Sequence, residues 1–249
     1  MNRFAAAATA LAALASVPLL GCAGAGQPPA SQSASQPVAT TPPTVSSRPG
    51  AVRYVAIGDS YTIGTSVAED ERWPNQLVEA LRGKVPLELV ANLAVNGASS
   101  QDVIDRQLSR VDELRPGFVT LLIGVNDVVR GIPADRYAGN VAQILDSLLG
   151  VVPADRLLVV STPDYTRTPR GGDFGDPQQQ RTAIGEVNQI ARSAATERGI
   201  RFVDIADIAE RAGDDRSLVA RDRLHPSGRQ YELWVERIEP AVARLFHAP

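Results

Sequence analysis

The stretch RYVAIGDSYT, residues 53–62, passes from a short apolar run directly into a polar turn. A short apolar run bounded by turn residues is typical of a buried β-strand. The Gly-Asp-Ser sequence that follows is ordinary turn composition and, taken alone, indicates nothing more specific. We therefore predict a strand over 53–58, with Ser60 just beyond its carboxyl end.

Four further strand candidates follow along the chain, at residues 87–93, 118–124, 156–161 and 201–204. The runs at 118–124 and 156–161 are almost wholly apolar, as expected for parallel strands that helices cover on both faces. Amphipathic helical patterns lie between the strands. Their apolar stripes are Leu77, Val78 and Leu81; Tyr137, Val141, Ile144, Leu145 and Leu148; Ile184, Val187, Ala191 and Ala194; and Trp234, Ile238, Val242 and Leu245.

Proline and glycine mark the predicted helix ends. The first helix begins at Trp73-Pro74 and stops at Gly83, and the last begins near Pro226 and is kinked by Pro240. The repeated alternation of strand and helix predicts a doubly wound, three-layer α/β/α sandwich around a mainly parallel, five-stranded, flavodoxin-like sheet. In such a sheet the functional residues lie at the carboxyl ends of the strands.

Four short polar blocks lie where this fold would place functional residues. They are Gly58-Asp59-Ser60-Tyr61-Thr62, Asn92-Leu93-Ala94-Val95-Asn96-Gly97, Gly124-Val125-Asn126-Asp127 and Asp222-Arg223-Leu224-His225-Pro226. The first three follow predicted strands, and the fourth precedes the last helix. Together and in this order they resemble the sequence blocks of the SGNH, or GDSL, hydrolase family. The resemblance extends over essentially the whole domain and implies the SGNH hydrolase fold and a serine esterase activity.

His225 is the predicted catalytic base on the residues alone. The chain has two histidines, and the other, His247, lies two residues from the C-terminus, where chain ends fray. A serine hydroxyl becomes a good nucleophile only when a neighbouring base takes its proton, and the family resemblance assigns that hydroxyl to Ser60. Asp222, three residues before His225, can reach the other imidazole nitrogen and stabilise the imidazolium.

The resemblance also implies an oxyanion hole, the set of N–H donors that stabilises the tetrahedral intermediate of ester cleavage. It would consist of the backbone N–H groups of Ser60 and Gly97 and the side-chain amide of Asn126. Glycine suits position 97 because the missing side chain lets a substrate approach the backbone. Asp59 and Asp127 adjoin these residues, and we expect them to orient the two loops through local hydrogen bonds.

The sequence argues against several other classes of protein. Thr62 stands where the nucleophile elbow of α/β-hydrolases requires its second glycine. Neither common Gly-rich phosphate loop is present. Two histidines and one cysteine are few for a catalytic zinc site, so no metal or cofactor is implied. Residues 51–249 carry 23 basic and 28 acidic side chains, a formal net charge of −5, which argues against a nucleic-acid partner.

The N-terminus predicts export and anchoring at a membrane. An apolar run over residues 4–20 follows Arg3; it is short for a bilayer-spanning helix and fits the apolar region of a signal peptide. The sequence LLGC at residues 19–22 resembles the lipobox of bacterial lipoproteins, which implies diacylation of Cys22. Two acyl chains anchor a protein stably, whereas one does not. The alternative is an ordinary cleaved signal in which Cys22 is incidental.

These features divide the chain into three parts. Residues 1–21 are the predicted lipoprotein signal peptide, and residues 51–249 are the hydrolase domain. Residues 22–50 begin with the lipidated cysteine and continue as a tether rich in Pro, Ser, Thr and Gln, a composition that cannot bury enough apolar surface to fold. We therefore expect an exported protein that is lipid-anchored to the outer face of the bacterial cell membrane.

The sequence indicates the chemical class of the substrate but not its identity. We expect a monomer that hydrolyses lipid, lysophospholipid or small acyl esters. The alternatives are a carbohydrate O-acetyl esterase or an acyltransferase on a cell-wall glycan, and a non-catalytic binding lipoprotein on the same fold. Residues 163–180 are a predicted polar loop, either a mobile lid that sets specificity or a variable surface excursion. Arg167, Arg170 and Asp173 in it suit either a polar substrate group or solvent.

Overall fold

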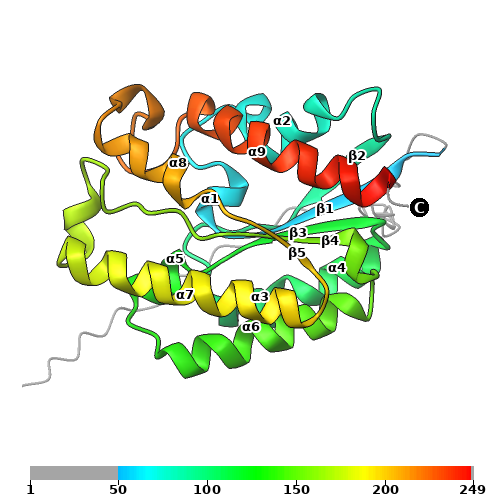
Figure 1. The fold of residues 1–249 in the computed structure, drawn as a ribbon, viewed down its shortest axis with the longest axis horizontal. Helices are drawn as coiled ribbons and strands as arrows, with labels where there is room; N and C mark the ends of the chain where they lie inside the picture. Colours follow the sequence, from blue (N-terminus) through cyan, green and yellow to red (C-terminus); the bar gives the residue numbers. More distant parts are fainter. Residues whose placement is uncertain (1–49, 248–249) are drawn as a thin grey trace, which may run out of the picture. The chain divides into compact units, whose positions relative to one another are not determined.

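The structure is a computed structural model that describes residues 50–247. The predicted signal peptide, Cys22 and nearly all of the predicted tether lie outside the described residues. Between residues 50 and 247, no helix combines the length and apolar character needed to cross a membrane. The described chain forms the predicted three-layer α/β/α sandwich (Figure 1).

A five-stranded sheet forms the middle layer, and all of its neighbouring strands pair in parallel. The strands are β1 (Val52–Gly58), β2 (Leu87–Asn92), β3 (Phe118–Leu122), β4 (Leu157–Val160) and β5 (Arg201–Val203). Their spatial order is β2-β1-β3-β4-β5, the flavodoxin-like order, in which the direction of winding reverses between β1 and β3. The predicted strands are therefore confirmed to within two residues at each end.

The register of the central strands brings the predicted functional blocks together. Gly58 at the end of β1 lies opposite Leu122 at the end of β3. The chain beyond β2 continues to bond β1, because the N–H of Val95 donates to the Gly58 carbonyl at 3.2 Å. The segments that follow β1, β2 and β3 therefore all begin at the carboxyl edge of the sheet, close to one another.

Helices cover both faces of the sheet, with α2, α8 and α9 on one side and α3, α4, α6 and α7 on the other (Figure 1). The helices are α1 (Ser60–Ile63), α2 (Trp73–Ala80), α3 (Ser100–Arg106), α4 (Leu108–Leu114), α5 (Val125–Val129), α6 (Ala134–Leu149), α7 (Pro177–Glu197), α8 (Ala206–Glu210) and α9 (Gly228–His247). Short 3₁₀ turns are η1 (Glu69–Glu71), η2 (Ala154–Arg156), η3 (Gly171–Phe174), η4 (Arg211–Gly213) and η5 (Arg216–Leu218).

The predicted apolar stripes form the core, with small differences. At the end of the stripe on α7 the fully buried residue is Ala195, whereas the predicted residue, Ala194, is half-buried. On α9, Leu245 is also only half-buried, and the helix continues through Pro240. Helix α2 ends at Ala80, earlier than the predicted stop at Gly83, because the chain tightens into turns around Leu81.

Residues 163–180 do not form the continuous polar loop that the composition predicts. Residues 163–166 are buried, η3 lies in the middle, and α7 already begins at Pro177. Burial of the polar Asp164 is offset by its hydrogen bond from the Thr166 N–H at 2.8 Å and by an ion pair with Arg181 at 3.2 Å. The first part of the segment is thus packed against the domain, whereas residues 169–180 are exposed except for Gly171, Phe174 and Gln180.

Candidate active site

Ser60 is the first residue of α1 and follows β1 after a single residue. Asp59 caps this short helix, since its Oδ1 accepts a hydrogen bond from the Tyr61 N–H at 3.0 Å. The first N–H groups of a helix have no acceptor within the helix, so the N–H of Ser60 is free to bond a ligand. Ser60 is 8% exposed and lines a cavity.

A buried glutamine fixes the strand end from which Ser60 departs. The Gln107 side chain accepts a hydrogen bond from the Gly58 N–H at 2.9 Å and donates one to the Gly58 carbonyl at 2.8 Å. Gln107 is 2% exposed, so no water competes for these bonds. No motif in the sequence marks Gln107, because it lies at the junction of α3 and α4, 49 residues from its partner.

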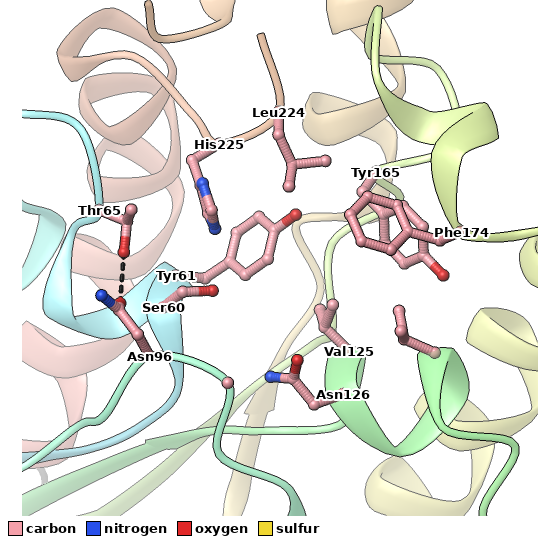
Figure 2. Close-up of a pocket in the computed structure, with 12 residues that line it drawn as sticks. Ser60, Tyr61, Thr65, Asn96, Val125, Asn126, Tyr165, Phe174, Leu224 and His225 are labelled. Carbon is pink, nitrogen blue, oxygen red and sulfur yellow. Dashed lines mark hydrogen bonds between the residues drawn. The ribbon is translucent and has the colours of Figure 1, made fainter. Parts of the chain in front are cut away.

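His225 and Asp222 form a pair in the loop before α9. The distance from His225 Nδ1 to Asp222 Oδ2 is 2.6 Å. An ionised carboxylate only accepts hydrogen bonds, so Nδ1 carries the proton and Nε2 is left with a free lone pair. Figure 2 shows the imidazole pointing toward Ser60. The ring of Tyr61 packs against it, with 5.1 Å between ring centroids.

The surroundings of Asp222 keep its carboxylate ionised. Partial burial raises its pKa, but hydrogen bonds from the His225 ring, the Leu224 N–H, the Ser66 hydroxyl and the His225 N–H outweigh burial and lower the pKa to about 2. Ser66 and Arg223, with φ of 70° and 66°, both adopt the left-handed conformation that non-glycine residues rarely take. Such backbone conformations cost free energy and often accompany functional geometry.

The Gly97 loop and Asn126 present further N–H donors to the same cavity. Gly97 has φ of 77°, and a Cβ added there would meet nothing within 4 Å, so its backbone is open to a ligand. Among the described residues, neither the Gly97 N–H nor the Ser60 N–H has a recorded acceptor. Asn126 Nδ2 donates one hydrogen to the Ala98 carbonyl at 2.9 Å, which leaves its second hydrogen for a ligand.

Helix α5 and its C-cap residue Arg130 contact the Gly97 loop and the start of α3. Arg130 Nη2 donates to the Gly97 carbonyl at 2.6 Å, and its Nη1 pairs with Asp102 at 3.1 Å. Asp127 accepts hydrogen bonds from the Ser100 N–H at 2.9 Å and from its hydroxyl at 2.5 Å. The hydrogen bonds of Asp127 to Ser100 therefore reach the start of α3, 27 residues away, whereas the sequence predicted local bonds that orient its own loop.

Ser60, Gly97, Asn126 and His225 all line one cavity of about 280 Å³, and Asp222 lies behind His225. Figure 2 shows Ser60, Asn126 and His225 around the cavity, together with several apolar side chains. Among the described residues no hydrogen bond joins Ser60 Oγ to His225 Nε2; catalytic hydrogen bonds often shorten only in the substrate complex. Between residues 50 and 247, no group of three His, Cys, Asp or Glu side chains could hold a metal ion.

Comparison with known proteins establishes the family. A sequence model of the GDSL-like lipase/acylhydrolase family matches residues 56–233. The chain belongs to this family. An arylesterase from Vibrio mimicus is 25% identical over 93 residues, which are 37% of this chain and 46% of the arylesterase. The alignment thus spans less than half of that relative.

Solved structures agree with the GDSL family assignment at the level of the fold. An acetyl xylan esterase variant from Geobacillus stearothermophilus superposes with a TM-score of 0.62 and 18% identity, covering 77% of this chain and 94% of that one. A putative lipolytic protein of the G-D-S-L family from Desulfitobacterium hafniense superposes with a TM-score of 0.61 and 21% identity. The match covers 78% of this chain and 99% of that one. The predicted SGNH hydrolase fold is confirmed.

Asp59 provides a prediction about stability. It is fully buried, and within residues 50–247 its Oδ2 has no hydrogen-bond partner. The pKa of Asp59 is raised from an ordinary 3.8 to about 7. Burial is the largest cause, and the nearby Asp127 carboxylate also raises the pKa, while the hydrogen bond from the Tyr61 N–H lowers it. Between these values the folded state holds a proton that the unfolded state has lost, so the free energy of unfolding falls as pH rises from about 4 to about 7.

We therefore expect Asp59→Asn to be more stable than wild type at mildly alkaline pH, by roughly 1–3 kcal/mol. Asparagine can still accept the Tyr61 N–H bond and has no charge to bury. Urea unfolding at acidic and alkaline pH measures the effect, and the two proteins should converge in acid. Equal stability at alkaline pH would show that ionised Asp59 is not the destabilising group.

Proposed function

We propose that the chain is a serine esterase that hydrolyses carboxylic esters at Ser60. Family membership places it among lipases and acylhydrolases. One observation carries the proposal for this chain: a serine hydroxyl, the free nitrogen of an aspartate-bound histidine and three uncommitted N–H donors surround the same cavity. Acyl transfer through a serine requires this combination of nucleophile, base and oxyanion donors.

The first half of the reaction transfers the acyl group to Ser60. His225 Nε2 takes the hydroxyl proton while Ser60 Oγ forms a bond to the ester carbonyl carbon. The carbonyl electron pair moves to oxygen, and the N–H groups of Ser60, Gly97 and Asn126 stabilise the resulting oxyanion. When the C=O bond re-forms, the bond to the alcohol oxygen breaks, and the imidazolium gives its proton to the departing alcohol.

The second half returns the enzyme to its starting state. A water molecule loses a proton to His225 Nε2 and attacks the acyl-enzyme carbonyl carbon. Collapse of the second oxyanion breaks the bond to Ser60 Oγ, which regains a proton from the imidazolium. Asp222 remains ionised throughout, because its pKa of about 2 lies far below neutral pH. It holds the imidazole in one tautomer and stabilises its charged form.

Asn126→Ala tests the oxyanion donors separately from the nucleophile. We expect kcat to fall by about 10² to 10³, because loss of one such donor typically has this effect. Labelling by a fluorophosphonate should persist, since Ser60 and His225 are retained. Asn188→Ala is a matched control: its amide also donates to a backbone carbonyl, that of Thr162 at 2.9 Å, but it does not line the cavity.

The measurement is kcat and KM on a p-nitrophenyl ester, with circular dichroism to show that each variant folds. A folded Asn126→Ala protein with kcat within a few-fold of wild type would contradict the assignment. Simultaneous loss of fold, turnover and labelling would instead indicate that Asn126 is structural, through its bond to the Ala98 carbonyl.

We also propose that the enzyme is exported and lipid-anchored through Cys22, on the outer face of the bacterial membrane. The sequence LLGC at residues 19–22, at the end of an apolar run, supports this proposal. Cys22→Ser in the native host should move the protein from the membrane fraction to the soluble fraction, because no acyl chains can be attached. Unchanged fractionation of the variant would contradict lipid anchoring.

A further inference from the structure

The cavity beside Ser60 has two unlike sides. Thr65 and Asn96, joined by a hydrogen bond of 2.5 Å, lie on one side in Figure 2. Asn96 is exposed, so this side is open to water. The other side in Figure 2 is formed by apolar and aromatic side chains: Tyr61, Val125, Tyr165, Phe174 and Leu224.

Phe174 and Tyr165 stand at the far end of the apolar side, away from Ser60 and His225 (Figure 2). Their rings pack edge to face, with centroids 5.7 Å apart. Tyr165 is 2% exposed, and its hydroxyl is hydrogen-bonded to Gln180 on α7. The Phe174 ring is therefore packed against a side chain that is itself held in place.

The turn that carries Phe174 is docked on the domain at two points. Gly171 begins η3 so close to the preceding chain that a Cβ there would lie 2.5 Å from the Thr166 carbonyl oxygen. The N–H of Arg170 donates to the Arg223 carbonyl at 3.2 Å, which ties the turn to the loop of His225. The hydrogen bond of Arg170 places this turn beside the loop of His225, and the half-buried Phe174 ring forms a wall of the cavity.

The order of events in ester hydrolysis indicates which part of the substrate binds on the apolar side of the cavity. After the first half-reaction the acyl group stays bonded to Ser60, while the alcohol leaves and water takes its place. The side next to exposed Asn96 suits a departing alcohol and an entering water. The apolar side suits the acyl chain, whose burial is favourable at every methylene.

We propose that Phe174 sets the acyl-chain limit of this enzyme, so that its substrates are esters of medium-length straight acyl groups. The inference rests on the proposed esterase function. The 280 Å³ cavity equals about nine water-sized volumes, at about 30 Å³ each. That volume includes the side next to Asn96, so the apolar side is a part of it, and we expect it to hold an acyl chain of about four to eight carbons before the chain meets the Phe174 ring.

The test uses the full chain and p-nitrophenyl esters from acetate to palmitate. For wild type, kcat/KM should rise about fourfold for each added methylene up to a limit between butanoate and octanoate, and then fall. Phe174→Ala should move the limit by at least about two carbons and raise the dodecanoate-to-butanoate ratio about 15-fold. Phe174→Trp should shorten the limit, which keeps the test informative if the alanine variant fails to fold.

Phe202→Ala is the matched control, because Phe202 is a half-buried phenylalanine on β5 that does not line the cavity. It should keep the wild-type chain-length profile. Folded Phe174 variants that also keep this profile, with turnover that depends on Ser60, would overturn the inference and leave the esterase intact. A wild-type chain that hydrolyses none of the esters would overturn the proposed function and this inference with it.

Discussion

Replacing Ser60 with alanine is expected to lower kcat by about 10⁶, the loss seen when a serine nucleophile is removed from a complete triad. The methyl group cannot form an acyl-enzyme, so both half-reactions disappear together. Residual turnover comes only from the remaining oxyanion donors acting on a water attack. The substitution removes one oxygen from a side chain with no recorded hydrogen bond in residues 50–247, so stability should change little.

Thr65→Ala is the control for this experiment. Thr65 lines the same cavity and also carries a hydroxyl, which bonds Asn96. We expect Thr65→Ala to keep kcat within about tenfold of wild type, since it removes one exposed hydrogen bond. If Ser60→Ala were no slower than Thr65→Ala on p-nitrophenyl esters, Ser60 would not be the nucleophile.

Asp222→Asn is expected to lower kcat by about 10⁴, the effect of the same change in a Ser-His-Asp protease. The amide can donate to Nδ1, which favours the tautomer with the proton on Nε2, where it cannot accept the Ser60 proton. Asparagine also lacks the charge that stabilises the imidazolium. Because the wild-type pKa of Asp222 is about 2, its protonation should not limit activity at mildly acidic pH.

The Ser66→Ala variant tests how much of the effect of Asp222 on kcat depends on the position of its carboxylate rather than on its charge. The Ser66 hydroxyl donates to Asp222 Oδ2 at 2.7 Å, so its loss leaves the carboxylate charged but less firmly held. We expect a decrease in kcat of about tenfold or less. Steady-state kinetics at neutral pH measures both variants. If Asp222→Asn lowered kcat by less than Ser66→Ala does, the role of Asp222 as the partner of His225 would be contradicted.

The sheet could be predicted closely because its strands are short apolar runs between clear turn residues. The runs at 118–124 and 156–161 became β3 and β4 with one or two residues trimmed at the ends. The start of α7 was missed, although its signal is present. Asp176 caps the helix by accepting the Gln179 N–H at 2.8 Å, and Pro177 occupies the first turn.

The grouping of the proposed site residues around one cavity could be predicted where such a residue directly follows a strand or precedes a helix. Ser60, Gly97 and Asn126 meet because parallel strands end at one edge of the sheet. The residues that hold them were not predictable. Gln107 and Arg130 act through contacts across 49 and 33 residues, and neither position has a composition that distinguishes it from an ordinary helix surface.

Fluorophosphonate labelling of the full chain, followed by mass spectrometry of the peptides, tests the central claim most directly. The reagent reacts with a serine that a neighbouring base has activated. We predict a single adduct on Ser60 in the wild-type protein and no adduct in Ser60→Ala. Equal labelling of the variant, or an adduct on another residue in the wild-type protein, would contradict the assignment of Ser60 as the nucleophile.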